Sequence, residues 1–205
     1  MDTQQQRERQ RWDDWAPTYD RSWFQRGFFR KVHDGVLEAL SPAKGERILD
    51  VGCGTGNLAM RIAGQGARVA GADAAPAMLL EAASKGRGRL LGLVAAVAEQ
   101  LPFAEGAFDA AVTVMSAHHW VDPKAGVGEL ARVLHPGGRV VLADIGRLGP
   151  LVDLLRRVFV ANTEHHSGWT PAELAALLYM AGFRNARMRT MRLLGTNVVL
   201  IAADR

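Results

Sequence analysis

The chain of 205 residues has little of what several protein classes need. Its one cysteine, Cys53, excludes a disulfide framework and a cysteine-clustered zinc site. Its longest uncharged apolar run, Leu90 to Ala98, contains a glycine and is far too short to span a bilayer. The first residues, Met1 to Arg11, are rich in Gln and Arg and have no apolar segment, so we expect no secretory signal. These absences predict a cytoplasmic protein.

A strong surplus of charge is also missing. Lys and Arg number 25 and Asp and Glu number 21, so the net charge of +4 favours anionic partners only weakly. Four arginines gather near the C-terminal end: Arg184, Arg187, Arg189 and Arg192. The residues between them include Met and Leu rather than the aromatics typical of a nucleic-acid surface. We interpret these arginines as solvated side chains on one face of a strand, and a nucleic-acid partner is not expected.

The remaining composition is that of an ordinary globular domain. Hydrophobic residues make up 48% and charged residues 22% of the chain, and it contains no internal repeat or low-complexity segment. At about 100–200 residues per domain, the length predicts a single domain. We expect an N-terminal helical cap over residues 1–42 and an α/β core over residues 45–205.

Short apolar runs that alternate with helical patterns define this core. Five runs are predicted as strands: 47–51, 68–72, 90–96, 108–115 and 140–145. Helices are predicted between them over 57–65, 75–83 and 122–133. Because the strand runs are continuously apolar rather than alternating, we expect helices on both faces of a parallel sheet.

Aromatic residues dominate the N-terminal part of the chain. Seven of them recur at helix-like intervals: Trp12, Trp15, Tyr19, Trp23, Phe24, Phe28 and Phe29. This spacing predicts helices, the first of them broken at Pro17. A second helix is expected over Phe28–Leu40, ending before a proline at position 42.

The C-terminal part predicts two helices and two strands. The first helix is expected from Pro150 to about Ala161. Thr170 and Glu173 form a capping box that begins the second helix, and Gly182 stops it. The two strands lie close together in the sequence: 184–191 and 197–203. Such a short connection implies an antiparallel hairpin, because a parallel pair needs a long crossover.

A glycine-rich bend follows the first predicted strand. Gly52, Gly54 and Gly56 stand at alternate positions, so the backbone can turn tightly and a ligand can reach the main chain. The next helix offers free N–H groups that suit a carboxylate or phosphate. Asp50 at the strand end could hold an ammonium group. Asp73 ends the second strand, where an open sheet binds the two hydroxyls of a ribose.

The glycine spacing separates two classes of cofactor. Nicotinamide dinucleotides need a third glycine three positions after the second, but here that position is Asn57 and the glycine comes one residue early. An adenosyl amino acid has no pyrophosphate, and it needs only a bend for its amino-acid end and an acid for its ribose. A purely structural glycine turn is the alternative at this point.

Five motifs in order resemble those of the class I S-adenosylmethionine-dependent methyltransferases, in the small-molecule branch similar to the enzymes of ubiquinone and menaquinone biosynthesis. The matching segments are residues 48–56, 71–73, 98–109, 118–120 and 132–139, and residues 12–20 are similar to the family's N-terminal aromatic-Ala-Tyr-Asp segment. The resemblance implies one methyltransferase domain with N-terminal helices and a Rossmann-like, doubly wound, mostly parallel seven-stranded sheet whose C-terminal strand is antiparallel. It also implies S-adenosyl-L-methionine as methyl donor, S-adenosyl-L-homocysteine as product, and a small-molecule acceptor.

The resemblance further implies roles for individual residues. The glycines would pack against the methionine part of the cofactor, and Asp73 would hold both ribose hydroxyls. Ala74 and Met78 would lie beside adenine, and Tyr19 belongs to a segment that folds over the cofactor. The residues assigned to the cofactor are Tyr19, Asp50, Gly52, Gly54, Gly56, Asp73, Ala74, Met78, Ala98, Glu99, Leu101 and Met115.

The adenine edge departs from the family pattern. Val97 stands where the family commonly has an Asp that bonds the adenine amino group. Either the Ala98 backbone and Glu99 bind the adenine amino group in its place or the affinity for the cofactor is weaker, with Leu101 closing the other side of the ring.

Methyl transfer requires the acceptor to be held in line and water to be excluded. A general base is needed only where the acceptor must lose a proton. His118 and His119, after the fourth strand, are the candidates, although a structural role for this pair is equally open. Trp120 would then form a wall, and His165 and His166 could cover the substrate. The histidines lack chelating spacing, so no metal is expected.

Three other functions fit parts of the pattern. A nucleic-acid or protein methyltransferase of the same fold would need a docking surface, and residues 116–119 read Ser-Ala-His-His in place of the Asn/Asp-Pro-Pro-Tyr/Phe motif of base methyltransferases. A non-catalytic cofactor-binding protein is permitted by Val97 and by the unassigned base. A nicotinamide dehydrogenase is disfavoured by the glycine spacing.

Overall fold

Seven strands form a single sheet in the computed structural model, which describes residues 3–21, 23–86, 88–147 and 169–205. The strands are β1 (Arg47–Val51), β2 (Arg68–Asp73), β3 (Gly92–Ala95), β4 (Phe108–Val114), β5 (Leu134–Ile145), β6 (Arg184–Leu193) and β7 (Thr196–Asp204). Their order is β3-β2-β1-β4-β5-β7-β6. Strands β1 to β5 pair in parallel, whereas β7 runs antiparallel to β5 and β6. The predicted mostly parallel sheet with an antiparallel finish is confirmed.

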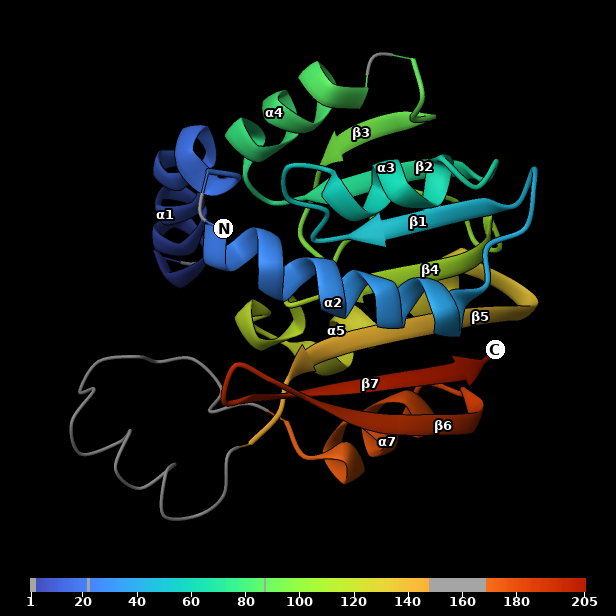
Figure 1. Cartoon of the computed structure of the whole chain (residues 1–205). Helices are drawn as coiled ribbons and strands as arrows, with labels where there is room; N and C mark the ends of the chain where they lie inside the picture. The colour runs from blue at the N-terminus through green and yellow to red at the C-terminus, as the bar shows by residue number, and fades with distance from the viewer. Residues whose placement is uncertain (1–2, 22, 87, 148–168) are drawn as a thin grey trace.

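Helices cover both faces of this sheet (Figure 1). They are α1 (Thr3–Tyr19), α2 (Trp23–Leu40), α3 (Asn57–Ala63), α4 (Pro76–Gly86), α5 (Pro123–Val133) and α7 (Pro171–Met180), with a short 3-10 helix η1 (Ala117–His119). Consecutive strand residues belong to opposite cores: Ile48 lies in the buried cluster that includes α2 and α3, and Leu49 lies in the cluster that includes α5 and α7. Two buried layers explain why the strands are apolar throughout.

Two helices begin with side-chain caps, and one of these is the capping box that the sequence predicts. The Thr170 hydroxyl accepts a hydrogen bond from the Glu173 N–H, and the Glu173 carboxylate accepts one from the Thr170 N–H, which completes the capping box of α7. At α5, the Asp122 carboxylate accepts a hydrogen bond from the Ala125 N–H. Each cap satisfies N–H groups that the helix itself leaves free.

The predicted break of the first helix at Pro17 is wrong. Helix α1 continues through Pro17 to Tyr19. The proline lies in the last turn, where its missing N–H costs one hydrogen bond and the helix stops soon afterwards. There the Thr18 hydroxyl donates to the Trp15 carbonyl oxygen. Helix α2 also begins earlier than expected, at Trp23.

Strand β5 is longer than predicted at its start. It begins at Leu134 rather than Val140. Leu134 pairs with Phe108, and the register then shifts before Ala110 pairs with Arg139. A proline and two glycines at positions 136–138 suggest a turn, but the bulged pairing keeps this segment in the sheet.

Two sequence predictions fall outside the described residues: the helix over 150–161 and the loop that carries His165 and His166. Within the described part of the chain, no helix combines the length and the apolar character needed to cross a membrane.

Candidate functional site

The carboxyl ends of β1, β2 and β4 meet at one edge of the sheet, where β1 has β2 on one side and β4 on the other. This change of direction in strand order is where open α/β sheets bind ligands. Two cavities lie there. The first, the sheet-edge cavity, is lined by Asp73, Ala74, Met78, residues 96–99, residues 114–116 and residues 119–121, together with parts of α1 and the glycine bend. The second, the arginine cavity, has a volume of about 580 Å³ and is lined by Arg26, Arg30, Arg61, Asp50 and the glycine bend, among others. Tyr19, Gly52, Gly54 and Val114 line both, so the cavities adjoin.

The glycine bend is open where a ligand would lie. Gly52 and Gly54 have φ of +71° and +53°, a backbone region that favours glycine. A Cβ on Gly52 would lie 2.1 Å from the Ser116 Oγ, whereas a Cβ on Gly54 would meet no protein atom within 4 Å. Gly56 precedes α3, lies against Ala82 and lines neither cavity. The main chain is thus exposed to the cavities at Gly54.

Asp73 lies at the end of β2 with its carboxylate fixed by the backbone. The Gly54 N–H donates to Oδ2 at 2.8 Å, and the Ala75 N–H donates to Oδ1 at 2.9 Å. Burial raises the pKa of this carboxyl group, and the two backbone hydrogen bonds oppose that effect. Each oxygen keeps a further lone pair, so the carboxylate can accept two hydroxyl donors at once.

Asp50 is buried and incompletely satisfied. The residue is only 2% exposed, and its Oδ2 has no hydrogen-bond partner among the described residues. Burial, followed by the charge of Asp73, raises the pKa of Asp50 to about 7. Because Asp50 lines the arginine cavity, an unsatisfied carboxylate oxygen there fits a cationic group such as an ammonium.

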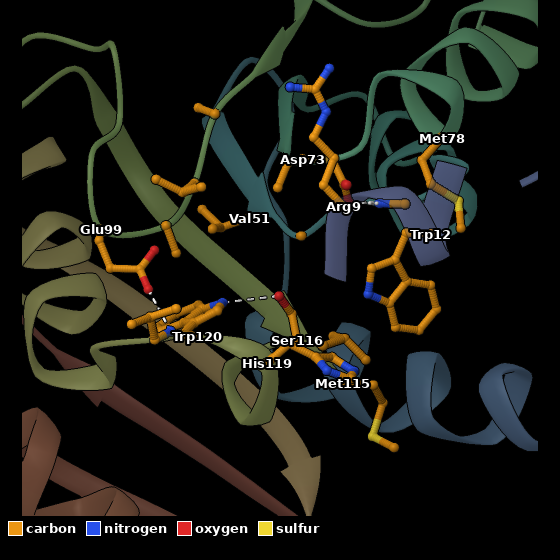
Figure 2. Close-up of a pocket in the computed structure, with 18 of the residues that line it drawn as sticks. Arg9, Trp12, Val51, Asp73, Met78, Glu99, Met115, Ser116, His119 and Trp120 are labelled. Atoms are coloured by element: carbon orange, nitrogen blue, oxygen red, sulfur yellow. Dashed lines mark hydrogen bonds between the residues drawn. The ribbon is translucent and has the colours of Figure 1, made fainter. Parts of the chain in front are cut away.

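Helix α1 closes one side of the sheet-edge cavity (Figure 2). Arg9, Trp12 and Tyr19 line it from this helix. The Asp13 carboxylate accepts a hydrogen bond of 2.9 Å from the Ala77 N–H at the start of α4. This carboxylate on α1 therefore holds the helical cap against α4, the helix that follows Asp73. Burial, then the nearby charges of two carboxylates, raises the pKa of Tyr19.

A second contact joins the end of α1 to the glycine bend. The Asp20 Oδ1 accepts hydrogen bonds from the Thr55 hydroxyl at 2.9 Å and from the Asn57 amide at 2.7 Å. The Lys85 Nζ lies 2.6 Å from Asp20 Oδ2. Burial acts to raise the pKa of Asp20, but the hydrogen bonds from these three partners outweigh it and leave that pKa below its usual value.

The two histidines after β4 occupy different surroundings. His119 lines the sheet-edge cavity, and its ring centroid lies 5.0 Å from that of Trp12. His118 lines neither cavity, and its Nδ1 lies 2.6 Å from Oδ1 of the fully buried Asp144. The two histidine rings are 3.9 Å apart. Of the pair, His119 is placed to meet a ligand, and Asp144 orients its neighbour.

The adenine edge predicted from the sequence is partly assembled. Ala74, Met78, Ala98, Glu99 and Met115 line the sheet-edge cavity. Leu101 is buried in the core and does not line it. The Glu99 Oε1 accepts hydrogen bonds from the N–H groups of Val121 and Asp122 at 2.8 and 3.2 Å. The carboxylate of Glu99 is therefore held at the cavity rim, and the role of Leu101 stays a prediction.

Sequence reasoning missed several cavity residues. Ser116 lines the sheet-edge cavity and accepts a hydrogen bond of 3.1 Å from the Trp120 Nε1. Arg26, Arg30 and Arg61 line the second cavity. The four-residue spacing of Arg26 and Arg30 is visible in the sequence and places both on one side of a helix. Only the folded chain, in which α2 and the glycine bend line the same cavity, shows that both arginines lie at a candidate site.

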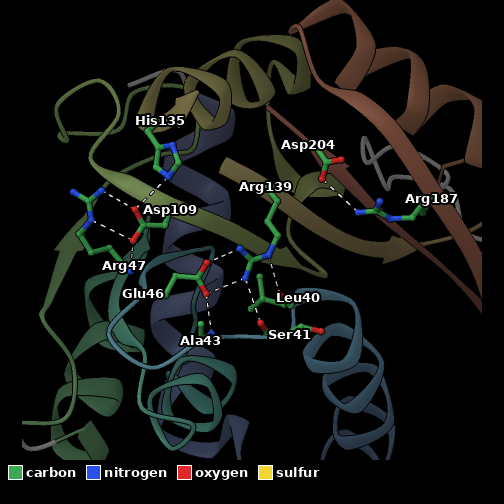
Figure 3. A network of polar contacts seen from close by, with 10 residues as sticks. All are labelled: Leu40, Ser41, Ala43, Glu46, Arg47, Asp109, His135, Arg139, Arg187 and Asp204. Atoms are coloured by element: carbon green, nitrogen blue, oxygen red, sulfur yellow. Dashed lines mark hydrogen bonds and ion pairs between the residues drawn. The ribbon is translucent and has the colours of Figure 1, made fainter. Parts of the chain in front are cut away.

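The opposite end of the sheet is closed by ion pairs (Figure 3). The Arg47 Nη2 lies 2.7 Å from Oδ1 of Asp109, which joins β1 to β4. Arg139 pairs with Glu46, and its Nε donates to the Leu40 carbonyl oxygen at the end of α2. The Arg139 contact fixes the end of α2 at this far end of the sheet, away from the two cavities at the carboxyl ends of the strands.

Comparison with solved structures agrees with this architecture. The cyclase SpnF superposes with a TM-score of 0.82 over 100% of this chain and 97% of that chain, at 20% sequence identity. At that level of identity the likeness concerns the fold alone.

Sequence relatives identify the family. Residues 49–142 match the family described as Methyltransferase domain. A demethylmenaquinone methyltransferase of Clavibacter sepedonicus is 41% identical over 127 residues, which cover 60% of this chain and 49% of that protein. The chain spans about half the length of several curated methyltransferases that it matches. A demethylmenaquinone methyltransferase of Beutenbergia cavernae is 39% identical over 188 residues, 80% of this chain and 77% of that protein. A relative this similar over most of its length shows that the chain belongs to the class I S-adenosylmethionine-dependent methyltransferase family.

Proposed function

We propose that this chain transfers a methyl group from S-adenosyl-L-methionine to a small apolar or aromatic acceptor. The observation that supports this most is the Asp73 carboxylate, held by Gly54 and Ala75 beside a bend that presents bare main chain to a cavity. The names of the relatives, demethylmenaquinone methyltransferases, favour a ring-bearing acceptor. Family membership indicates the methyl donor, and Asp73 with the glycine bend supplies the groups that would bind it.

The residues present fit this cofactor. Asp73 offers two acceptors for a ribose diol, and the unsatisfied Oδ2 of Asp50 offers one for an α-ammonium group. The space in front of Gly54 leaves room for the chain between them. When bound, the cofactor supplies a methyl group activated by a sulfonium leaving group.

The chain's own residues then orient the reactants and exclude water. Helix α1 covers the sheet-edge cavity with Trp12 and Tyr19, which shields the reacting centre. His119 lines the same cavity and is the candidate to accept a proton from an acceptor hydroxyl at a ring nitrogen. Asp144 holds the neighbouring His118 through Nδ1 and so fixes the ring against which His119 lies.

Binding of the cofactor and its product tests the proposal directly. Isothermal titration of the purified chain with S-adenosyl-L-homocysteine is expected to show one site per chain with micromolar or tighter affinity. Methyl transfer is then followed with methyl-labelled donor and a panel of phenols and quinols. Absence of heat with both S-adenosyl-L-methionine and S-adenosyl-L-homocysteine would contradict the proposed function.

The raised pKa of Asp50 predicts a pH-dependent stability for the ligand-free protein. Because its folded pKa is about 7, above the value near 4 of an unfolded Asp, its favourable contribution is complete below pH 4 and is lost as pH rises through 7. Relative to Asp50→Asn, the wild-type free energy of unfolding should fall by about 3 kcal/mol between pH 5 and pH 8. Urea titrations of both proteins at the two pH values measure it.

Saturating S-adenosyl-L-homocysteine serves as the internal control for this effect. An ammonium group beside ionised Asp50 lowers the cost of its charge, so the pH-dependent difference should shrink when the ligand is bound. Parallel stability curves for wild type and Asp50→Asn, with and without ligand, would show that Asp50 is not the titrating group.

A further inference from the structure

The arginine cavity carries more positive charge than its carboxylates balance. Arg26 and Arg30 line it from α2 and Arg61 from α3. Arg61 pairs with Asp34 and donates to the Arg30 carbonyl oxygen. Among the described residues, Arg26 and Arg30 form no ion pair, although the charge of Arg30 also acts on Asp34, whose pKa lies below its usual value chiefly because of the Arg61 hydrogen bond.

The negative groups of this cavity are already accounted for. Asp20 is neutralised by Lys85 and also accepts hydrogen bonds from Thr55 and Asn57. Asp50 is the partner proposed above for the cofactor's ammonium group. His33 adds no charge at neutral pH, because burial and then the charge of Arg61 lower its pKa to about 4. Within the part of the chain that the structure describes, two guanidinium groups therefore line the cavity without a carboxylate of their own.

The space exceeds what the cofactor's amino-acid end needs. The cavity measures about 580 Å³. A single water needs only about 10–15 Å³ of such space, so a tail of about eight non-hydrogen atoms leaves most of it free. Apolar groups also line the cavity, among them the side chains of Phe29 and Val114 and the ring of Tyr19. A second ligand with one anionic end and one apolar end therefore matches the side chains that line this cavity.

We infer that the methyl acceptor is a small aromatic or apolar molecule that carries an anionic group, bound by Arg26 and Arg30 while its apolar body lies against Phe29. This inference rests on the proposed function and specifies its substrate class. A guanidinium group binds a carboxylate through paired, charge-assisted hydrogen bonds, which makes it a specific receptor for such a group. The cavity adjoins the glycine bend at Gly52 and Gly54, so an acceptor held there lies next to the cofactor site.

Paired probes test the inference on the full chain saturated with S-adenosyl-L-homocysteine. Isothermal titration compares 3-phenylpropionate with its neutral amide, 3-phenylpropanamide. The acid is expected to bind at least about tenfold more tightly, and Arg26→Gln and Arg30→Gln should each remove most of that preference. Arg30→Lys should retain part of it. Arg187→Gln, on β6 and paired with Asp204, is the matched control and should change nothing.

The outcomes separate this inference from the proposed function. Equal affinity for acid and amide, or a preference that survives both Gln substitutions, would overturn it. A large loss of S-adenosyl-L-homocysteine affinity in the Gln variants would also overturn it, because the arginines would then bind the cofactor's own carboxylate. Failure of the wild-type chain to bind S-adenosyl-L-homocysteine at all would instead remove the proposed function itself.

Discussion

Replacing Asp73 by Asn should raise the dissociation constant for S-adenosyl-L-homocysteine by about 100-fold or more. An amide offers one acceptor where the carboxylate offers two, so a ribose diol loses at least one charge-assisted hydrogen bond. The amide nitrogen also faces a backbone donor, because the N–H groups of Gly54 and Ala75 both point at this side chain. Together these losses amount to about 3 kcal/mol of binding free energy.

Isothermal titration of the Asn variant measures this loss. Asp204→Asn is the matched control, since Asp204 is a surface carboxylate at the end of β7 that pairs with Arg187. The control should bind like the wild type. A dissociation constant for Asp73→Asn within threefold of the wild-type value would show that Asp73 does not contact the ligand.

Alanine at Gly54 and at Gly52 should give opposite results. At Gly54 the new methyl group meets no protein atom within 4 Å but points into the ligand space, so binding of S-adenosyl-L-homocysteine should fall at least about 100-fold. The free energy of unfolding should fall by only about 1–2 kcal/mol, the cost of a left-handed backbone for alanine. Gly52→Ala adds a clash with Ser116, so its unfolding free energy should fall by about 3 kcal/mol or more.

A double variant separates strain from clash at Gly52. Ser116→Gly removes the side chain that lies 2.1 Å from the new Cβ, so Gly52→Ala with Ser116→Gly should recover the part of the stability lost to the clash. Thermal unfolding is compared among the wild type, Gly52→Ala, Ser116→Gly and the double variant, and each protein is titrated with S-adenosyl-L-homocysteine. If Gly54→Ala binds ligand normally, the space in front of the bend is not the cofactor site.

Local patterns were sufficient to predict the sheet, for a reason visible in particular residues. Ile48 and Leu49 are consecutive and both fully buried, because each faces a different helical layer. Continuous apolar runs therefore mark strands covered on both faces, and a short C-terminal connection can only join antiparallel neighbours. Boundaries were less accurate where pairing with a distant strand decides them, as at Leu134.

The candidate site was predicted only where its parts lie close together in the sequence. Gly52, Gly54 and Asp73 belong to one strand-helix-strand unit, so their spacing carries the signal. The contact of Asp20 with Lys85 spans 65 positions, and no local pattern indicates it. The arginine cavity was missed for the same reason, since α2 meets the glycine bend only in the folded chain.

The position of β7 between β5 and β6 has a consequence for biosynthesis. This strand comes later in the sequence than both of its neighbours, and its residues Val198 to Ala203 are buried. During translation, the segments that form the sheet-edge cavity leave the ribosome first, while one flank of β5 still lacks its partner. A nascent chain stalled before β7 should therefore expose the unpaired, apolar edge of β5, which chaperones can bind.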